Sequence, residues 1–258
     1  MEHMLVALGS YIAIALETVL LFEKVRKDEK RLEQDLTTAR EVQQALLPAI
    51  PVVPGLQIAV GSEPALQLRG DFYDFLPRGE GDFAFAVGDM AGKATPAALY
   101  GSLAIGLLRA HMLQECCDPS NVLSVVNEQL RLSNLDNRFV AMILAIFDPG
   151  TRTLRVSNSG LPLPLLVREG KVTEIDSSGR PLGLLPDSKY SSTTVQLHSG
   201  DVLVLLSDGL IEATGTDDEE FGLGRIKEIL SESSTHSAQE MVGQLMLTNQ
   251  RFVAGNLD

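Results

Sequence analysis

The sequence has few cysteines, few histidines and no tryptophan, and the first two shortages exclude several classes of protein. Its two cysteines are adjacent, at Cys116 and Cys117, so no disulfide framework is expected and a reducing, cytoplasmic location is the prediction. The four histidines are scattered and no Cys-x-x-Cys pair occurs, which argues against a structural zinc site. A metal bound by this chain would need carboxylate ligands.

Basic side chains are also scarce. Lysine and arginine together number 21 against 34 aspartates and glutamates, so the formal net charge is −13. So acidic a chain matches the phosphate backbone of nucleic acid poorly, and we expect no nucleic-acid partner. With 258 residues, of which 45% are hydrophobic, the chain is long enough for one large domain plus a helical appendage.

A proline-rich segment at residues 47–55 divides the chain, because its prolines remove amide donors and stop any helix. Before it, residues 4–22 are apolar almost all round. Glu17 inside this run, and the lack of basic residues ahead of it, favour a helix packed against a partner over a membrane span or a signal peptide. The chain accordingly falls into three parts, residues 1–22, 23–47 and 48–258.

The middle part has the pattern of a two-stranded coiled coil, in which apolar residues recur at alternating spacings of three and four. The seam consists of Phe22, Val25, Glu29, Leu32, Leu36, Ala39, Gln43 and Leu46. Two of these eight positions are polar, so the seam is weak. We expect a homodimer through residues 22–46, and the alternative is a helix that packs this stripe on its own domain.

After Gly55 the pattern indicates mixed helices and strands. Alternating or fully apolar runs predict strands at residues 57–61, 82–87, 139–147, 153–156, 163–167, 171–175, 192–197 and 201–206. Turn residues at Asp148-Pro149-Gly150-Thr151 and at Glu169-Gly170 predict hairpins, and hence a largely antiparallel sheet. Capping residues and periodicity predict helices at residues 95–113, 118–132, 224–230 and 237–251.

Aspartates stand where apolar strands stop. Asp89 and Asp208 each follow such a strand, an acidic cluster occupies residues 69–74, and the chain ends at Asp258. Any one Asp-Gly pair is typical of a turn. Several carboxylates at one rim of a sheet, however, repel each other unless a cation lies among them, and hard oxygen ligands suit Mg²⁺ or Mn²⁺. The carbonyl of Met90 is a candidate for the same ligand shell.

Two nucleotide-related alternatives fit poorly. Residues 88–95 resemble a phosphate-binding loop, but three residues rather than four separate the glycines, and Ala94 rather than Ser or Thr follows Lys93. Asp89 would also bring a negative charge into the phosphate cradle. A nucleotide cyclase would use paired aspartates as well, but we find no positions suited to base or ribose recognition.

Five motifs follow one another in order between residues 39 and 258. They are Ala39-Arg40-Glu41-Val42-Gln43-Gln44-Ala45-Leu46-Leu47-Pro48, Gly70-Asp71-Phe72-Tyr73-Asp74, Val87-Gly88-Asp89-Met90-Ala91-Gly92-Lys93, Pro96-Ala97-Ala98-Leu99 and Leu206-Ser207-Asp208-Gly209-Leu210-Ile211-Glu212-Ala213. This set resembles the bacterial sporulation-E/RsbU-type serine phosphatases of the metal-dependent protein phosphatase superfamily. The apolar N-terminal helix resembles, over a much shorter stretch, the last helix of a GAF sensor domain.

The resemblance implies an α+β fold, a four-layer α-β-β-α sandwich of two antiparallel sheets, with two Mn²⁺ or Mg²⁺ ions at one end. It implies that Asp89 bridges the ions, that the Met90 carbonyl and Asp208 bind one ion each, and that Asp71 acts directly or through water. Asp258 stands where the family has the acidic residue of its closing motif. Catalysis would accordingly rest on Asp71, Asp89 and Asp208.

The implied activity is hydrolysis of phosphoserine or phosphothreonine on a bacterial regulatory protein by a metal-activated water, without a phosphoenzyme. By the same resemblance the substrate is a phosphorylated anti-sigma-factor antagonist of the STAS type, and residues 1–22 end a GAF-like sensor. The alternative is a catalytically degenerate phosphatase fold that binds a partner and regulates it through the N-terminal dimer helix.

The sequence departs from the family pattern at several positions. Arg69 replaces the first glycine of Gly-Gly-Asp, and it is either a phosphate-binding residue or a solvated neighbour of Asp71. Ala94 replaces a glycine and Leu161 a histidine. The sequence stops at Asp258, before a final strand of the family, so we expect a neighbouring strand without its partner and a metal ligand at a fraying end.

Overall fold

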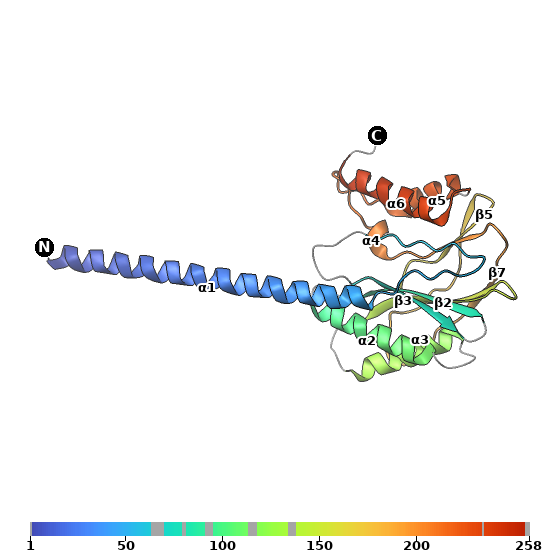
Figure 1. Cartoon of the computed structure of the whole chain (residues 1–258), viewed down its shortest axis with the longest axis horizontal. Helices are drawn as coiled ribbons and strands as arrows, with labels where there is room; N and C mark the ends of the chain where they lie inside the picture. The colour runs from blue at the N-terminus through green and yellow to red at the C-terminus, as the bar shows by residue number, and fades with distance from the viewer. Residues whose placement is uncertain are drawn as a thin grey trace. The chain divides into compact units, whose positions relative to one another are not determined.

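The structure is a computed structural model of the chain (Figure 1). It describes residues 2–62, 70–78, 81–90, 95–112, 118–133, 138–233 and 235–255. By their internal contacts the residues form two compact units, 1–44 and 45–258.

Helix α1 runs without interruption from Glu2 to Leu46. It ends just before Pro48, as the proline-rich segment predicts. The seam residues Phe22, Val25 and Leu32 are 70%, 52% and 61% exposed, so they are open to a partner in the single chain. No helix in the described part of the chain combines the length and the apolar character needed to span a bilayer.

Two antiparallel sheets form the framework of residues 45–258. The larger sheet has the strand order β1-β2-β3-β4-β7 and the smaller one the order β6-β5-β8. The strands are β1 (Phe72–Arg78), β2 (Asp82–Met90), β3 (Val140–Asp148), β4 (Thr153–Ser159), β5 (Leu165–Arg168), β6 (Lys171–Glu174), β7 (Thr193–Gln196) and β8 (Val202–Val204). All the pairings are antiparallel, as the predicted hairpins require.

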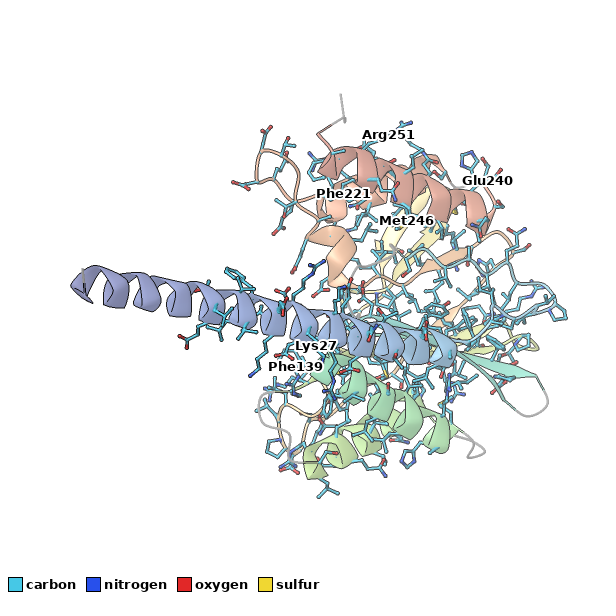
Figure 2. The ribbon with its side chains drawn as sticks, turned by 60° about the vertical axis from the view of Figure 1, so that its left-hand side comes forward. Lys27, Phe139, Phe221, Glu240, Met246 and Arg251 are labelled. Atoms are coloured by element: carbon cyan, nitrogen blue, oxygen red, sulfur yellow. The ribbon has the colours of Figure 1, made fainter. Side chains whose placement is uncertain are left out.

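Helices cover the outer faces of both sheets. They are α2 (Thr95–Met112), α3 (Pro119–Leu132), α4 (Asp208–Ile211), α5 (Gly222–Glu232) and α6 (Ala238–Val253). Figure 1 shows α2 and α3 on one side of the sheets and α5 and α6 on the other. The caps are those expected: Asp118 accepts a hydrogen bond from the Ser120 amide at 3.0 Å, and Ser237 forms a capping box with Glu240. Figure 2 shows Glu240 and Arg251 near opposite ends of α6, an arrangement that complements the helix dipole.

Along β3, alternate side chains enter two different hydrophobic cores. The even-numbered residues of 142–146 pack under α2 and α3, whereas the odd-numbered residues of 143–147 pack between the two sheets. On β5, Leu166 lies between the sheets, while Leu165 and Val167 pack with α5 and α6. A period of two on strands covered on both faces produces the four layers. The predicted α-β-β-α sandwich is thereby confirmed.

The structure differs from the sequence-based expectation at two strands. Residues 57–61 do not form a strand; the Gln57 side chain accepts a hydrogen bond from the Ala238 amide at 3.3 Å instead. An apolar pattern alone does not make a strand without a backbone partner. Strand β1 was not predicted, because Asp74 and Pro77 interrupt its apolar pattern. Pro77 is tolerated since β1 is an edge strand of its sheet.

Candidate metal centre

Strand pairing brings Asp71 and Asp89 to the same end of the larger sheet. In the ladder between β1 and β2, Phe72 lies opposite Gly88, so Asp71 directly precedes β1 at the point where β2 carries Asp89. Strand β3 begins there too, with Val140 opposite Met90. The register of three strands therefore sets the position of these two carboxylates.

Asp208 comes from the chain that follows the smaller sheet. Strand β8 ends at Val204, and after the buried Leu206 the chain enters the single turn of α4, of which Asp208 is the first residue. The charge of Asp208 acts on Asp89. The site is therefore assembled from both sheets of the sandwich.

The three carboxylates disfavour one another's ionised forms. The pKa of Asp89 is raised from 3.8 to about 7, first because burial penalises its charge, then because the negative charges of Asp71 and Asp208 oppose it. A hydrogen bond from the Met90 amide to Asp89 Oδ1, at 2.7 Å, offsets part of this rise. A positive charge placed among the three would reverse it.

The backbone of Gly70 packs closely against these oxygens. A Cβ built at Gly70 would lie 2.5 Å from Asp89 Oδ1 and 2.9 Å from the Met90 carbonyl oxygen. A carboxylate oxygen and a carbonyl oxygen therefore lie close together next to the Gly70 backbone, where any side chain at residue 70 would clash with both. Oxygen donors of these two kinds are the ligands that Mg²⁺ and Mn²⁺ prefer, so the residues fit a hard divalent cation.

The carboxylates are close enough to interact electrostatically but are not drawn together as a complete ligand set. Within the described ranges, no three Asp, Glu, His or Cys side chains are grouped tightly enough to hold an ion by themselves. Backbone oxygens and water would have to supply the remaining ligands, as is usual for Mg²⁺.

Most of the predicted site residues lie together. Asp71, Asp89, Met90 and Asp208 meet at one end of the sandwich. Their role as metal ligands stays a prediction. Arg69 and Asp258, the other two, lie outside the described residues.

An ion pair beside the site, between a buried carboxylate and a half-exposed arginine, was missed from the sequence. Asp74 is 1% exposed and accepts two hydrogen bonds from Arg109, from Nε at 2.7 Å and from Nη2 at 3.1 Å. The same Nη2 donates to the Leu46 carbonyl at 3.1 Å, so Arg109 joins α2, β1 and the end of α1. Asp74 follows Asp71 by three residues, so the pair fixes the strand that begins at the site. The signal that could have revealed this pair is the alternation along β1, which puts Asp74 on the same buried face as Phe72.

The chain is similar to known proteins in both sequence and structure. The family model "Stage II sporulation protein E (SpoIIE)" matches residues 79–258. The phosphoserine phosphatase RsbU of Bacillus subtilis is 27% identical over 223 residues, which cover 85% of this chain and 66% of RsbU. A second curated relative is covered over 41% of its length, so the chain spans about two thirds or less of these relatives.

Solved structures agree with this result. The SiaA-PP2C domain of Pseudomonas aeruginosa has a TM-score of 0.72 at 21% identity, covering 88% of this chain and 92% of that domain. RsbX in complex with magnesium has a TM-score of 0.55 at 16% identity, covering 74% of this chain and 83% of that one. These likenesses establish a PP2C-type fold. Since the family model covers well over half of the residues, the chain belongs to the stage II sporulation protein E family.

Proposed function

We propose that this chain is a metal-dependent protein serine/threonine phosphatase. The observation that carries the proposal is the convergence of Asp71, Asp89 and Asp208 beside the Met90 carbonyl, on a PP2C-type fold. The phosphoserine phosphatase activity in the name of RsbU, and the magnesium in the RsbX structure, support the same function.

The proposed cofactor is a pair of Mn²⁺ or Mg²⁺ ions held by residues of this end of the sandwich. Asp89 would bridge the ions, the Met90 carbonyl and Asp208 would each hold one, Asp71 would act directly or through water, and Asp258 would complete the set. When bound, the ions lower the pKa of a shared water towards 7 and neutralise charge on the phosphoryl oxygens.

Residues of the chain itself orient the Asp89 carboxylate and keep other side chains away from it. The backbone amide of Met90 orients Asp89 Oδ1, and Gly70 keeps side chains out of the space beside it. Arg69, the neighbour of Gly70, is proposed to bind the phosphoryl group of the substrate. No serine or cysteine nucleophile has a role in this scheme, so no covalent phosphoenzyme should be trapped when a reaction on labelled substrate is quenched.

The proposed substrate is phosphoserine or phosphothreonine on a bacterial regulatory protein in the cytoplasm. An anti-sigma-factor antagonist of the STAS type is the specific candidate, on the strength of the family resemblance.

Single substitutions at the carboxylates test the proposal. Asp89→Asn and Asp208→Asn should each lower manganese-dependent release of phosphate from a phosphoserine peptide by about 10²-fold or more, since each removes a charge that stabilises the transition state. Asp82→Asn, at the other end of β2, is the matched control and should keep wild-type activity. Full activity in both site variants would refute the assignment.

The loose spacing of the described carboxylates favours one second candidate, a degenerate phosphatase fold that only binds a partner. In that case the wild-type chain would release no phosphate with either metal. Partner binding would also be unchanged by Asp89→Asn, whereas a phosphatase should bind its phosphorylated substrate differently once the site loses a ligand.

A parallel dimer through residues 22–46 is the proposed means of regulation. Its support is the exposure of seam residues such as Leu32, which is 61% exposed. Leu32→Lys with Leu36→Lys should convert a dimer to a monomer and change phosphatase activity together, because helix packing would be coupled to the site. Gln34→Lys with Thr38→Lys adds the same charge off the seam and should do neither. A monomer of unchanged activity would contradict the coupling.

A further inference from the structure

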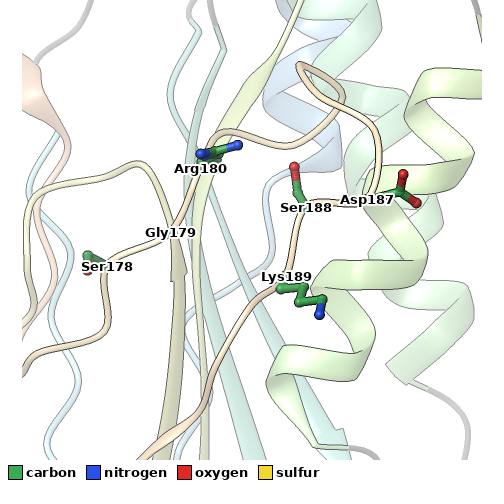
Figure 3. A pocket seen from close by; sticks show the side chains of 6 residues that line it. All are labelled: Ser178, Gly179, Arg180, Asp187, Ser188 and Lys189. Carbon is green, nitrogen blue, oxygen red and sulfur yellow. The ribbon is translucent and has the colours of Figure 1, made fainter.

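The loop between β6 and β7 forms a basic pocket that the proposed chemistry does not use. The loop folds back on itself, so that two short arms face each other (Figure 3). The pocket between them has a volume of ≈ 540 Å³ and is lined by Ser178, Gly179, Arg180, Asp187, Ser188 and Lys189.

Hydrogen bonds hold the segment between the two arms in place. Leu182 and Val140 exchange both backbone hydrogen bonds, at 2.7 and 3.0 Å. The Gly183 amide donates to Oδ1 of Asn127, a side chain that is 1% exposed, at 2.8 Å. Gly179 packs so closely that a Cβ there would overlap the backbone of the neighbouring strand β4. The pocket is therefore preformed, and binding would not require the loop to become ordered.

The charge of this pocket is opposite to that of the whole chain. Arg180 and Lys189 are exposed, and neither forms a salt bridge with a carboxylate of the described residues. Asp187 is the one acidic lining residue, and Figure 3 shows its carboxylate pointing away from Arg180. On a chain of net charge −13, two cations without ionic partners form a local site of attraction for an anion.

The segment that joins the two arms of the pocket is anchored near the candidate metal centre. Leu182 pairs with Val140, which in turn pairs with Met90, so two strand spacings separate the backbones of Leu182 and Met90. At about 4.8 Å per spacing this is about 10 Å. An extended peptide advances about 3.3 Å per residue, so about three residues span the distance to Leu182, and the arms that line the pocket lie on either side of that residue. We therefore take a residue about four positions from the phosphoserine as the one that would enter the pocket.

We propose that this pocket binds an acidic side chain, aspartate or glutamate, of the phosphorylated protein substrate. Arg180 and Lys189 are then residues that determine substrate specificity. The inference rests on the proposed phosphatase function and adds a requirement on the substrate sequence. Because the net charge of the chain is −13, an acidic partner is repelled overall, and this pocket would also fix the direction in which the substrate lies across the metal centre.

Steady-state kinetics on paired phosphoserine peptides test the proposal. The two peptides carry either glutamate or glutamine about four residues from the phosphoserine, and p-nitrophenyl phosphate serves as a substrate that is too small to reach the pocket. The wild type should show a KM about three- to tenfold lower for the glutamate peptide, as expected for two partly solvated charge contacts. Arg180→Gln with Lys189→Gln should remove this preference without changing kcat or the turnover of p-nitrophenyl phosphate.

Two further variants sharpen the experiment. Lys171→Gln removes an exposed cation of β6 and should leave the preference intact. Asp187→Asn removes the acidic charge of the pocket and should lower the KM for the glutamate peptide, and asparagine suits the positive φ of 53° at this position. A glutamate preference that survives the double substitution, or an equal loss on all three substrates, would overturn the proposal.

A binding measurement separates failure of this inference from failure of the proposed function. Fluorescence anisotropy with the labelled peptides and the metal-free Asp89→Asn protein should show the same glutamate preference, and the same loss in the double variant, without turnover. If no substrate is hydrolysed but this preference persists, the phosphatase function fails and the pocket stands. If millimolar inorganic phosphate displaces both peptides equally and no glutamate preference is seen, the pocket is a phosphate site and the inference fails.

Discussion

Asp74 on β1 and Asp89 on β2 are carboxylates on neighbouring strands, the first buried and the second half-buried, and their surroundings are opposite in charge. Asp74 is bound by Arg109 through two hydrogen bonds. Asp89 faces Asp71 and Asp208, and its pKa is raised to about 7. Asp74 lies on the face of the larger sheet that α2 covers, whereas Asp89 lies on the other face, at an odd-numbered position of β2. Since Asp74 is the more deeply buried of the two, the difference arises from the partner groups and not from the depth of burial alone.

The comparison separates a structural carboxylate from a functional one. A buried charge whose counter-charge belongs to the same chain is already compensated, so it supports the fold and does not require a bound ion. A buried charge placed among like charges weakens the fold, and an arrangement of this kind is typical of sites that bind a cation or perform chemistry. Four changes test this contrast.

Breaking the Asp74–Arg109 pair should have the largest effect on stability. Arg109→Met leaves the Asp74 carboxylate buried and unpaired, which should lower the free energy of unfolding by about 3 kcal/mol. Urea denaturation followed by circular dichroism measures the change. Arg131→Met, which removes an exposed pair with Glu128, is the control and should cost less than about 0.5 kcal/mol. Equal effects of the two substitutions would show that the buried pair has no special weight.

Manganese should stabilise the wild type through the other region. At a metal concentration of about 100 times Kd, a ligand that binds only the folded state adds about 2.7 kcal/mol. Asp89→Asn should abolish this gain, because it removes the proposed bridging carboxylate, whereas Asp82→Asn should keep it. Thermal melting with metal and with EDTA gives the comparison. A metal-induced rise in Tm that persists in Asp89→Asn would place the ion elsewhere.

The raised pKa of Asp89 should make metal-free stability depend on pH. Its folded pKa of about 7 exceeds the unfolded value of 3.8, so between these pH values the folded state keeps a proton that the unfolded chain has lost. This contribution is complete below the unfolded pKa and is lost as the pH rises through the folded one. After allowance for partial exposure it amounts to about 2 kcal/mol. Relative to the wild type, metal-free Asp89→Asn should gain that amount between about pH 4 and pH 7. Urea midpoints that run parallel in the two proteins across this range would contradict the shift.

A side chain at residue 70 should weaken the metal site, because it would push the neighbouring oxygens out of place. In Gly70→Ala the new methyl group would compete with Asp89 Oδ1 and the Met90 carbonyl for the same space. We expect the affinity for Mn²⁺ to fall by about tenfold, within the range for groups that support a metal ligand. Isothermal titration calorimetry measures it, and Gly106→Ala on α2, where a Cβ meets nothing, serves as the control. Unchanged affinity would mean that the ion does not occupy the space beside residue 70.

Much of the fold could be predicted from local patterns. The alternation on β3 and the capping residues Asp118 and Ser237 each act over a few residues, and the structure agrees with them. β1 could not be predicted in this way. Its inward-facing Asp74 is acceptable only because Arg109, 35 residues away, reaches it.

In the candidate site, too, local motifs could be predicted from the sequence and contacts between distant residues could not. The motif residues Asp71, Asp89 and Asp208 could be named from the sequence, and the structure brings them together. The pair of Asp74 with Arg109, and the pocket with Arg180 and Lys189, depend on the way in which the chain folds back on itself. Neither has a spacing that marks it in the sequence.

The central position of β2 has a consequence for judging whether a preparation is native. Strand β2 is paired through seven residues to β1 and through eight to β3. A slip of one residue in either ladder would turn Asp89 towards the opposite face while preserving nearly the same content of sheet and helix. Far-ultraviolet circular dichroism would therefore not distinguish a protein with shifted strand register from the native one. Only a probe of the strand ends, where the candidate metal ligands lie, would tell the two apart.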